Sequence, residues 1–85
     1  MREISFYSNN ISEIIDITKE LGENCNCLSP TPYGIKKQKF EVEIFDSKNQ
    51  LIFNGYFFEN FREFVKILHK IQNGIIRYSC NIQPY

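Results

Sequence analysis

The hydrophobic pattern of the chain changes its period once between residues 39 and 73. As far as Phe53, apolar residues alternate with polar ones on either side of a polar turn, which is typical of strands with one buried face. After Asn60 they recur about every 3.6 residues, the spacing of an amphipathic helix. The pattern predicts a β-hairpin followed by a helix that packs on it. The alternating apolar residues are Phe40, Val42, Ile44, Leu51 and Phe53, and the helical ones are Phe61, Phe64, Val65, Leu68 and Ile71.

The same signals occur on both sides of this stretch. Residues 2–7 alternate and predict a strand. Asn10 is a good N-cap for a first helix that Gly22 ends, and Asn60 and Gly74 hold the same positions around the second helix. The β-branched and aromatic run 75–80 predicts a last strand.

The order strand, helix, strand, strand, helix, strand predicts an α+β fold of the ferredoxin-like split βαβ type. Right-handed crossovers place both helices on one face of a four-stranded antiparallel sheet and leave the other face open. At 85 residues the chain is expected to form a single domain, 1–85. Residues 23–38 are long for a helix-to-strand connection, and they are expected to form either a functional loop or a further short edge strand near Cys25–Leu28.

The open face is the first candidate binding surface. A two-residue turn at Ser47–Lys48 would pair Val42 with Phe53 and Ile44 with Leu51 toward the helices. Glu41 and Glu43 would then face outward, together with apolar side chains of the kind that mark a protein interface. The aromatic and apolar residues expected on this open face are Tyr7, Phe45, Ile52 and Tyr56.

The connection Asn24–Lys39 is the second candidate contact surface. Its prolines restrict the backbone, and Tyr33 offers an amphipathic anchor. Its positive charge would steer the protein toward an acidic partner. The basic residues concerned are Lys36, Lys37 and Lys39.

Charge and composition narrow the function classes. Ten basic residues balance ten acidic ones, so the net positive field of a general polyanion binder is missing. The N-terminus lacks the apolar core of a signal peptide, and a cytoplasmic protein is expected. Thirteen Ile and nine Asn indicate an AT-rich coding sequence, which is common in low-GC bacteria, their phages and plasmids.

No stretch carries a catalytic, phosphate-binding or metal motif, so neither enzyme activity nor a cofactor is expected. Three cysteines are an odd number without secretory context, and free thiols are expected. Zinc binding is the less favoured alternative, because the spacing lacks paired knuckles. The four residues that such a zinc site would collect are Cys25, Cys27, Cys80 and His69.

Two short segments resemble the RNA-recognition motif family. Phe6–Ile11 is similar to its first-strand motif and Asn54–Phe58 to its third-strand motif. The resemblance implies that Tyr7 and Tyr56 stack on unpaired bases. The chain departs from the family pattern where Asn54 replaces a basic residue, Phe57 a small one and Glu59 an aliphatic one.

The sequence therefore favours a non-enzymatic module that binds a protein of unknown identity, with a homodimer through the open face as one form. A small inhibitor, immunity or anti-defence protein of a phage or mobile element fits this description. Single-stranded RNA binding is the alternative, and a metabolite-binding regulatory domain is a third hypothesis. No membrane association is expected.

Overall fold

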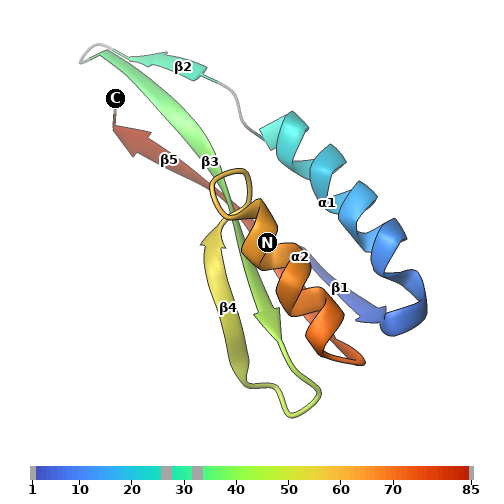
Figure 1. Cartoon of the computed structure of the whole chain (residues 1–85). Coiled ribbons are helices and arrows are strands. Elements are labelled where there is room, and N and C mark those ends of the chain that lie inside the picture. The colour runs from blue at the N-terminus through green and yellow to red at the C-terminus, as the bar shows by residue number, and fades with distance from the viewer. Residues whose placement is uncertain (1, 26–27, 32–33, 85) are drawn as a thin grey trace.

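The computed structural model describes residues 2–25, 28–31 and 34–84. Two helices lie against one face of an antiparallel sheet (Figure 1), which confirms the predicted α+β class. The elements are β1 (Arg2–Tyr7), a 3₁₀ turn (Ser8–Asn10), α1 (Ile11–Cys25), β2 (Leu28–Thr31), β3 (Gly34–Phe45), β4 (Leu51–Tyr56), α2 (Phe61–Lys70) and β5 (Asn73–Pro84).

The strand order is β1-β5-β3, and β2 and β4 both pair with the other edge of β3. Every neighbouring pair is antiparallel, so β1 runs parallel to β3 with β5 between them. In the same way β4 runs parallel to β5 with β3 between them. The chain thus forms two interleaved split βαβ units, β1-α1-β3 and β4-α2-β5, with the first strand at an edge of the sheet.

The β3–β4 hairpin has a longer turn than predicted. Asp46 donates its N–H to the carbonyl of Gln50 at 3.0 Å, and Asn49 donates its N–H to the carbonyl of Asp46 at 2.9 Å. Asn49 has a φ of 63°, the left-handed conformation that completes a three-residue hairpin loop. The carboxylate of Asp46 also accepts the N–H groups of Lys48 and Gln50 at 2.9 Å each.

A bulge in β4 adds a second shift to the pairing. Phe45 lies opposite Leu51, whereas Ile44 lies opposite Phe53, so Ile52 is the extra residue. The turn and the bulge each displace the predicted register by one residue. The two shifts cancel for Phe53 and Tyr56, which lie on the helix side and the open face as predicted. Between the turn and the bulge they do not cancel, so Leu51 lies on the open face and Ile52 on the helix side, the reverse of the prediction. The prediction that Ile52 faces outward is therefore wrong: it packs against the core cluster, and Leu51 is 49% exposed.

Phe57 lies at the centre of the core, in the connection between β4 and α2. It is 0% exposed, and its ring makes edge-to-face contacts with four other phenylalanines at centroid distances of 5.1–6.1 Å. Its backbone N–H donates to the carbonyl of Phe40 at 2.9 Å and so continues the β3–β4 pairing by one residue. The four surrounding rings are those of Phe40, Phe58, Phe61 and Phe64.

A buried polar pair fixes α1 on the sheet. The hydroxyl of Thr18 donates to the carbonyl of Ile14 at 2.7 Å and lies 2.7 Å from the hydroxyl of Tyr78. Because Thr18 has a single hydroxyl proton, Tyr78 donates to Thr18. Both side chains are buried, so this contact specifies the position of the helix over β5.

The predicted helix-end residues have other roles than expected. α1 continues through Gly22, where the rings of Phe58 and Phe40 leave no room for a Cβ. Gly74 lies within β5, and a Cβ there would collide with the carbonyl of Phe45. Asn60 does precede α2, but its side chain donates to the carbonyl of Tyr56 at 2.9 Å instead of capping the helix.

The long connection after α1 contains the edge strand that the sequence left open. β2 occupies Leu28–Thr31 and pairs with the start of β3 at Gly34–Lys37. The basic positions from Lys36 onward therefore belong to a strand and not to a loop. β2 and the far ends of β3 and β5 extend the sheet beyond α2 (Figure 1), and the molecule measures 46 × 23 × 21 Å.

A disulfide joins the end of α1 to β5. Cys25 and Cys80 are bonded, with their Cα atoms 6.1 Å apart, a separation within the usual range for disulfides. The expectation of free thiols is wrong for these two residues. Antiparallel β5 returns past the C-terminal end of α1, and this long-range arrangement cannot be seen in the cysteine spacing. Cys27 lies outside the described residues.

Candidate partner-binding surface

An apolar row crosses the face of the sheet that the helices leave open. Residues directly opposite one another in antiparallel strands share a face. The register places Ile75 of β5 between Ser5 of β1 and Phe45 of β3, and Phe45 opposite Leu51 of β4. Tyr7 follows Ser5 on the same face and is 58% exposed. Tyr7, Phe45, Leu51 and Ile75 are called the apolar end below.

A row of charged residues borders the apolar end. Arg77 lies opposite Glu3 on one side and opposite Glu43 on the other. Its Nε donates to Glu3 Oε1 at 2.8 Å, and its Nη2 lies 2.8 Å from the same oxygen. The guanidinium also lies 4.8 Å from the centroid of the Phe45 ring. An apolar area with a paired, charged margin has the anatomy of a protein interface.

The apolar end also borders a hollow of about 370 Å³. Tyr7 and Ile75 line one part of it, and the β3–β4 turn forms another part with Asp46, Ser47 and Asn49. The carboxylate of Asp46 already accepts two backbone N–H groups of the turn, so this wall is preorganised. The surface therefore combines exposed apolar side chains with a depression that a partner's side chain can enter.

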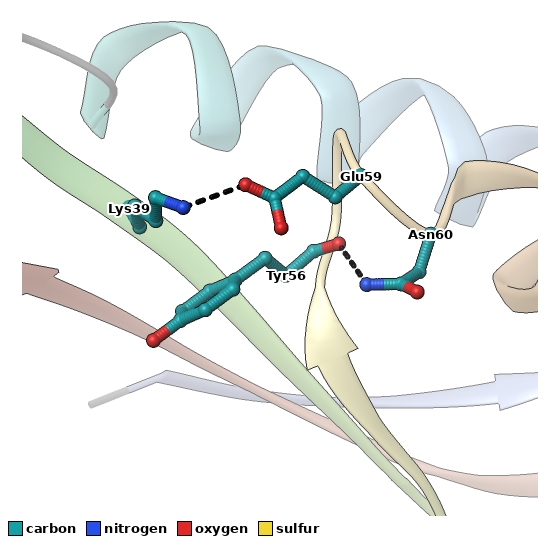
Figure 2. Close-up of polar contacts among 4 residues, drawn as sticks. All are labelled: Lys39, Tyr56, Glu59 and Asn60. Atoms are coloured by element: carbon teal, nitrogen blue, oxygen red, sulfur yellow. Dashed lines mark hydrogen bonds and ion pairs between the residues drawn. The ribbon is translucent and has the colours of Figure 1, made fainter.

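Lys39 lies on the same face, next to Tyr56. Figure 2 shows its ammonium group directed at the carboxylate of Glu59, at 2.7 Å, and Nζ is 4.9 Å from the centroid of the Tyr56 ring. The hydrogen bond to Glu59 raises the pKa of Lys39, and the neighbouring negative charge adds to this effect. Lys39 stays protonated, but the adjacent carboxylate of Glu59 offsets part of its positive charge, which weakens the predicted steering by that charge.

This ion pair gives a prediction about pH. Because the folded-state pKa of Lys39 is raised, the contribution of the pair to stability is complete below the ordinary lysine pKa of 10.5 and is lost as pH rises through the higher folded value. A titration of Lys39 followed by NMR should give a pKa above 10.5 in the native protein. In Glu59→Gln the pKa of Lys39 should fall toward 10.5. An equal pKa in both proteins would mean that the pair does not form in solution.

The structure separates Tyr7 from Tyr56. They lie on β1 and β4, with β5 and β3 between these strands, about 14 Å apart across the sheet at about 4.8 Å per strand. Tyr56 lies opposite Glu41, at the other end of the β3–β4 pairing from Phe45. The two tyrosines therefore do not form the neighbouring pair of stacking residues that the resemblance to RNA-recognition motifs implies.

Three of the predicted contact residues cannot be assigned to this surface. Tyr33 and the side chains of Lys36 and Lys37 lie outside the described residues. Of the four aromatic and apolar residues expected on the open face, Tyr7 and Phe45 belong to the apolar end, Tyr56 lies beside Lys39, and Ile52 packs with the core. Leu51 and Ile75 were missed by the sequence analysis. The signal for Leu51 was present in Asp46 and Asn49, which suit a longer turn.

In the part of the chain that the structure describes, no three histidine, cysteine or acidic side chains gather as metal ligands, and His69 is exposed. Neither α1 nor α2 is long and apolar enough to cross a membrane.

Comparison of the chain with protein-family models, curated proteins and solved structures gives no match.

Proposed function

We propose that this chain is a non-enzymatic protein-binding module that contacts its partner through the apolar end of the open sheet face. One observation carries the proposal: Tyr7 and Leu51 are 58% and 49% exposed beside the half-buried Phe45 and Ile75. Burying exposed apolar side chains of this kind is the main favourable contribution to protein association. An inhibitor or anti-defence role belongs to the same proposal.

The chemistry of the surface describes the partner. Tyr7, Leu51 and the adjoining hollow suit an apolar or aromatic side chain that projects from the partner. Arg77 and Glu43, on neighbouring strands, offer both signs of charge at the margin. The partner surface should therefore be mainly apolar at its centre with charges of both signs around it, and not uniformly acidic or basic.

The RNA-binding alternative has weaker support. Its two stacking residues lie on opposite edges of the sheet, and the chain has no net charge. A measurement of salt dependence separates the two functions. Binding through the apolar end should change little with salt, whereas binding to a phosphate backbone should weaken steeply.

Paired substitutions test the proposal. Tyr7→Ser combined with Leu51→Ser should weaken binding to a partner captured by the wild-type protein by at least about tenfold, because both anchors are removed from the exposed surface. Phe58→Ser is the matched control, since Phe58 is 48% exposed but packs toward Gly22 on the helix side. Affinities are measured by calorimetry after circular dichroism has verified each fold. Equal affinities of the double variant and the wild type would refute the proposed surface.

A further inference from the structure

The second half of β5 has an edge that no described strand covers. β1 pairs with β5 from Asn73 to Tyr78 and begins at Arg2. β5 continues to Pro84, and from residue 79 onward it pairs with β3 on its other side. The sheet thus contains a β5 edge segment, residues 79–84, with one side paired.

The hydrogen-bond pattern shows which backbone groups point out from this edge. Ser8 donates its N–H to the carbonyl of Gln72 at 2.7 Å, which continues the β1–β5 register, so the even-numbered residues of β5 bond toward β1. The bond from Phe57 N–H to the carbonyl of Phe40 independently directs even residues of β3 toward β4, and therefore odd ones toward β5. Both observations therefore place the N–H and C=O groups of the even-numbered β5 residues on the β1 side of the strand.

Beyond Tyr78, the same alternation directs the N–H and C=O groups of Cys80 and Ile82 to the uncovered side, together with the C=O of Pro84. Cys80 is exposed at this edge. The segment reads Ser-Cys-Asn-Ile-Gln-Pro and contains no charged residue. Natural edge strands are usually protected by charges, bulges or prolines, and here the only such residue is Pro84 at the end of the strand.

We propose that the β5 edge segment pairs with the same segment of a second copy of this chain, in antiparallel orientation about a twofold axis. A twofold axis perpendicular to the sheet reverses the strand direction and keeps the same face of the sheet on the same side. Antiparallel pairing continues the pattern of every other neighbouring pair in the sheet. One segment thus supplies both partners and leaves neither edge uncovered.

The position of β1 selects the register. Centring the pair on Ile82 places the N–H of Ile82 against the carbonyl of Ile82 of the partner subunit, and the N–H of Cys80 against the carbonyl of Pro84 of the partner subunit. Both outward donors are then used, and the one bond missing from this register is that to the carbonyl of Cys80, because Pro84 has no N–H. Centring on Asn81 would instead bring the partner's Pro84 against Tyr78, which already pairs with Arg2.

The dimer has a consequence for binding. Because the twofold axis keeps the faces aligned, the open faces of both copies lie on the same side of one continuous sheet. A dimer would therefore present two apolar ends to one side, and a partner with two matching sites would bind it more tightly than a monomer. The pairing itself does not depend on the proposed function, since it uses the strand edge and not the apolar end.

Sedimentation equilibrium from about 5 µM to about 1 mM tests the dimer. The wild type and Ile82→Val should both show a monomer–dimer equilibrium, because valine keeps the N–H. Ile82→Pro removes an outward donor that the monomer does not use, and it should remain monomeric. A wild type that stays monomeric at the highest concentration, or an equally strong dimer in Ile82→Pro, would overturn the proposal.

Hydrogen exchange of the unsubstituted protein gives a second test that does not depend on how the proline variant folds. The amides of Cys80 and Ile82 should exchange at least about tenfold more slowly at high protein concentration than at low concentration, because they form backbone hydrogen bonds only in the dimer. The amides of Ser79 and Asn81 bond toward β3 and should be protected at both concentrations. A dimer in which the Cys80 and Ile82 amides stay unprotected would place the interface elsewhere.

Discussion

Reduction of the Cys25–Cys80 disulfide should lower the melting temperature by about 15 °C or more. The bond closes a loop with a sequence separation of 55, and the loss of unfolded-state entropy from such a loop corresponds to about 4 kcal/mol. In a domain of this size, 1 kcal/mol changes the melting temperature by about 4–8 °C. Thermal denaturation with and without reductant measures the difference directly.

Single cysteine variants identify which two cysteines form the stabilising disulfide. Cys25→Ser and Cys80→Ser should each reproduce the loss of stability, and neither should respond to reductant. Cys27→Ser is the matched control and should melt like the wild type. If Cys27→Ser instead lowers the melting temperature and Cys25→Ser does not, Cys80 is bonded to Cys27 and not to Cys25. In a reducing compartment the protein would have the lower stability of the reduced form.

Phe64→Ala should destabilise the fold by about 3–5 kcal/mol. Phe64 is 0% exposed, and its ring contacts those of Phe57 and Phe53 at centroid distances of 5.1 and 6.2 Å. Truncation leaves a cavity between α2 and the hairpin that these rings cannot fill without losing their own contacts. Urea denaturation should show the midpoint falling with an unchanged slope.

Phe58→Ala is the control for the loss of a phenyl ring as such. Phe58 follows Phe57 in the chain but is 48% exposed, so its replacement should cost much less than that of Phe64. Equal losses in the two variants, or an unchanged midpoint for Phe64→Ala, would show that α2 does not bury this face against the sheet.

The parts of the fold that depend on local pattern could be predicted from the sequence. The change from alternation to helical spacing near Asn60 located the hairpin and α2, and it placed Phe64 and Leu68 in the core, where both are 0% exposed. These features follow from which side chains share a face within one element. The number and order of the elements gave the α+β class for the same reason.

The parts that depend on register or on distant contacts could not be read in this way. A turn one residue longer and a bulge at Ile52 exchange the faces of two adjacent residues, although both shifts are small. Tyr7 and Phe45 were placed on the open face, but their neighbours Leu51 and Ile75 emerge only when the strand pairing is known. The strand order that separates Tyr7 from Tyr56 is equally non-local, as is the meeting of Cys25 with Cys80.

Photo-crosslinking from the apolar end tests the proposed binding surface most directly. A photoreactive amino acid is introduced singly at Tyr7, at Leu51 and, as a control on the helix side, at Phe58. The partner should be crosslinked from positions 7 and 51 and not from position 58, because the first two share the open face. Crosslinking of the same partner from position 58, with none from positions 7 and 51, would contradict the proposed surface.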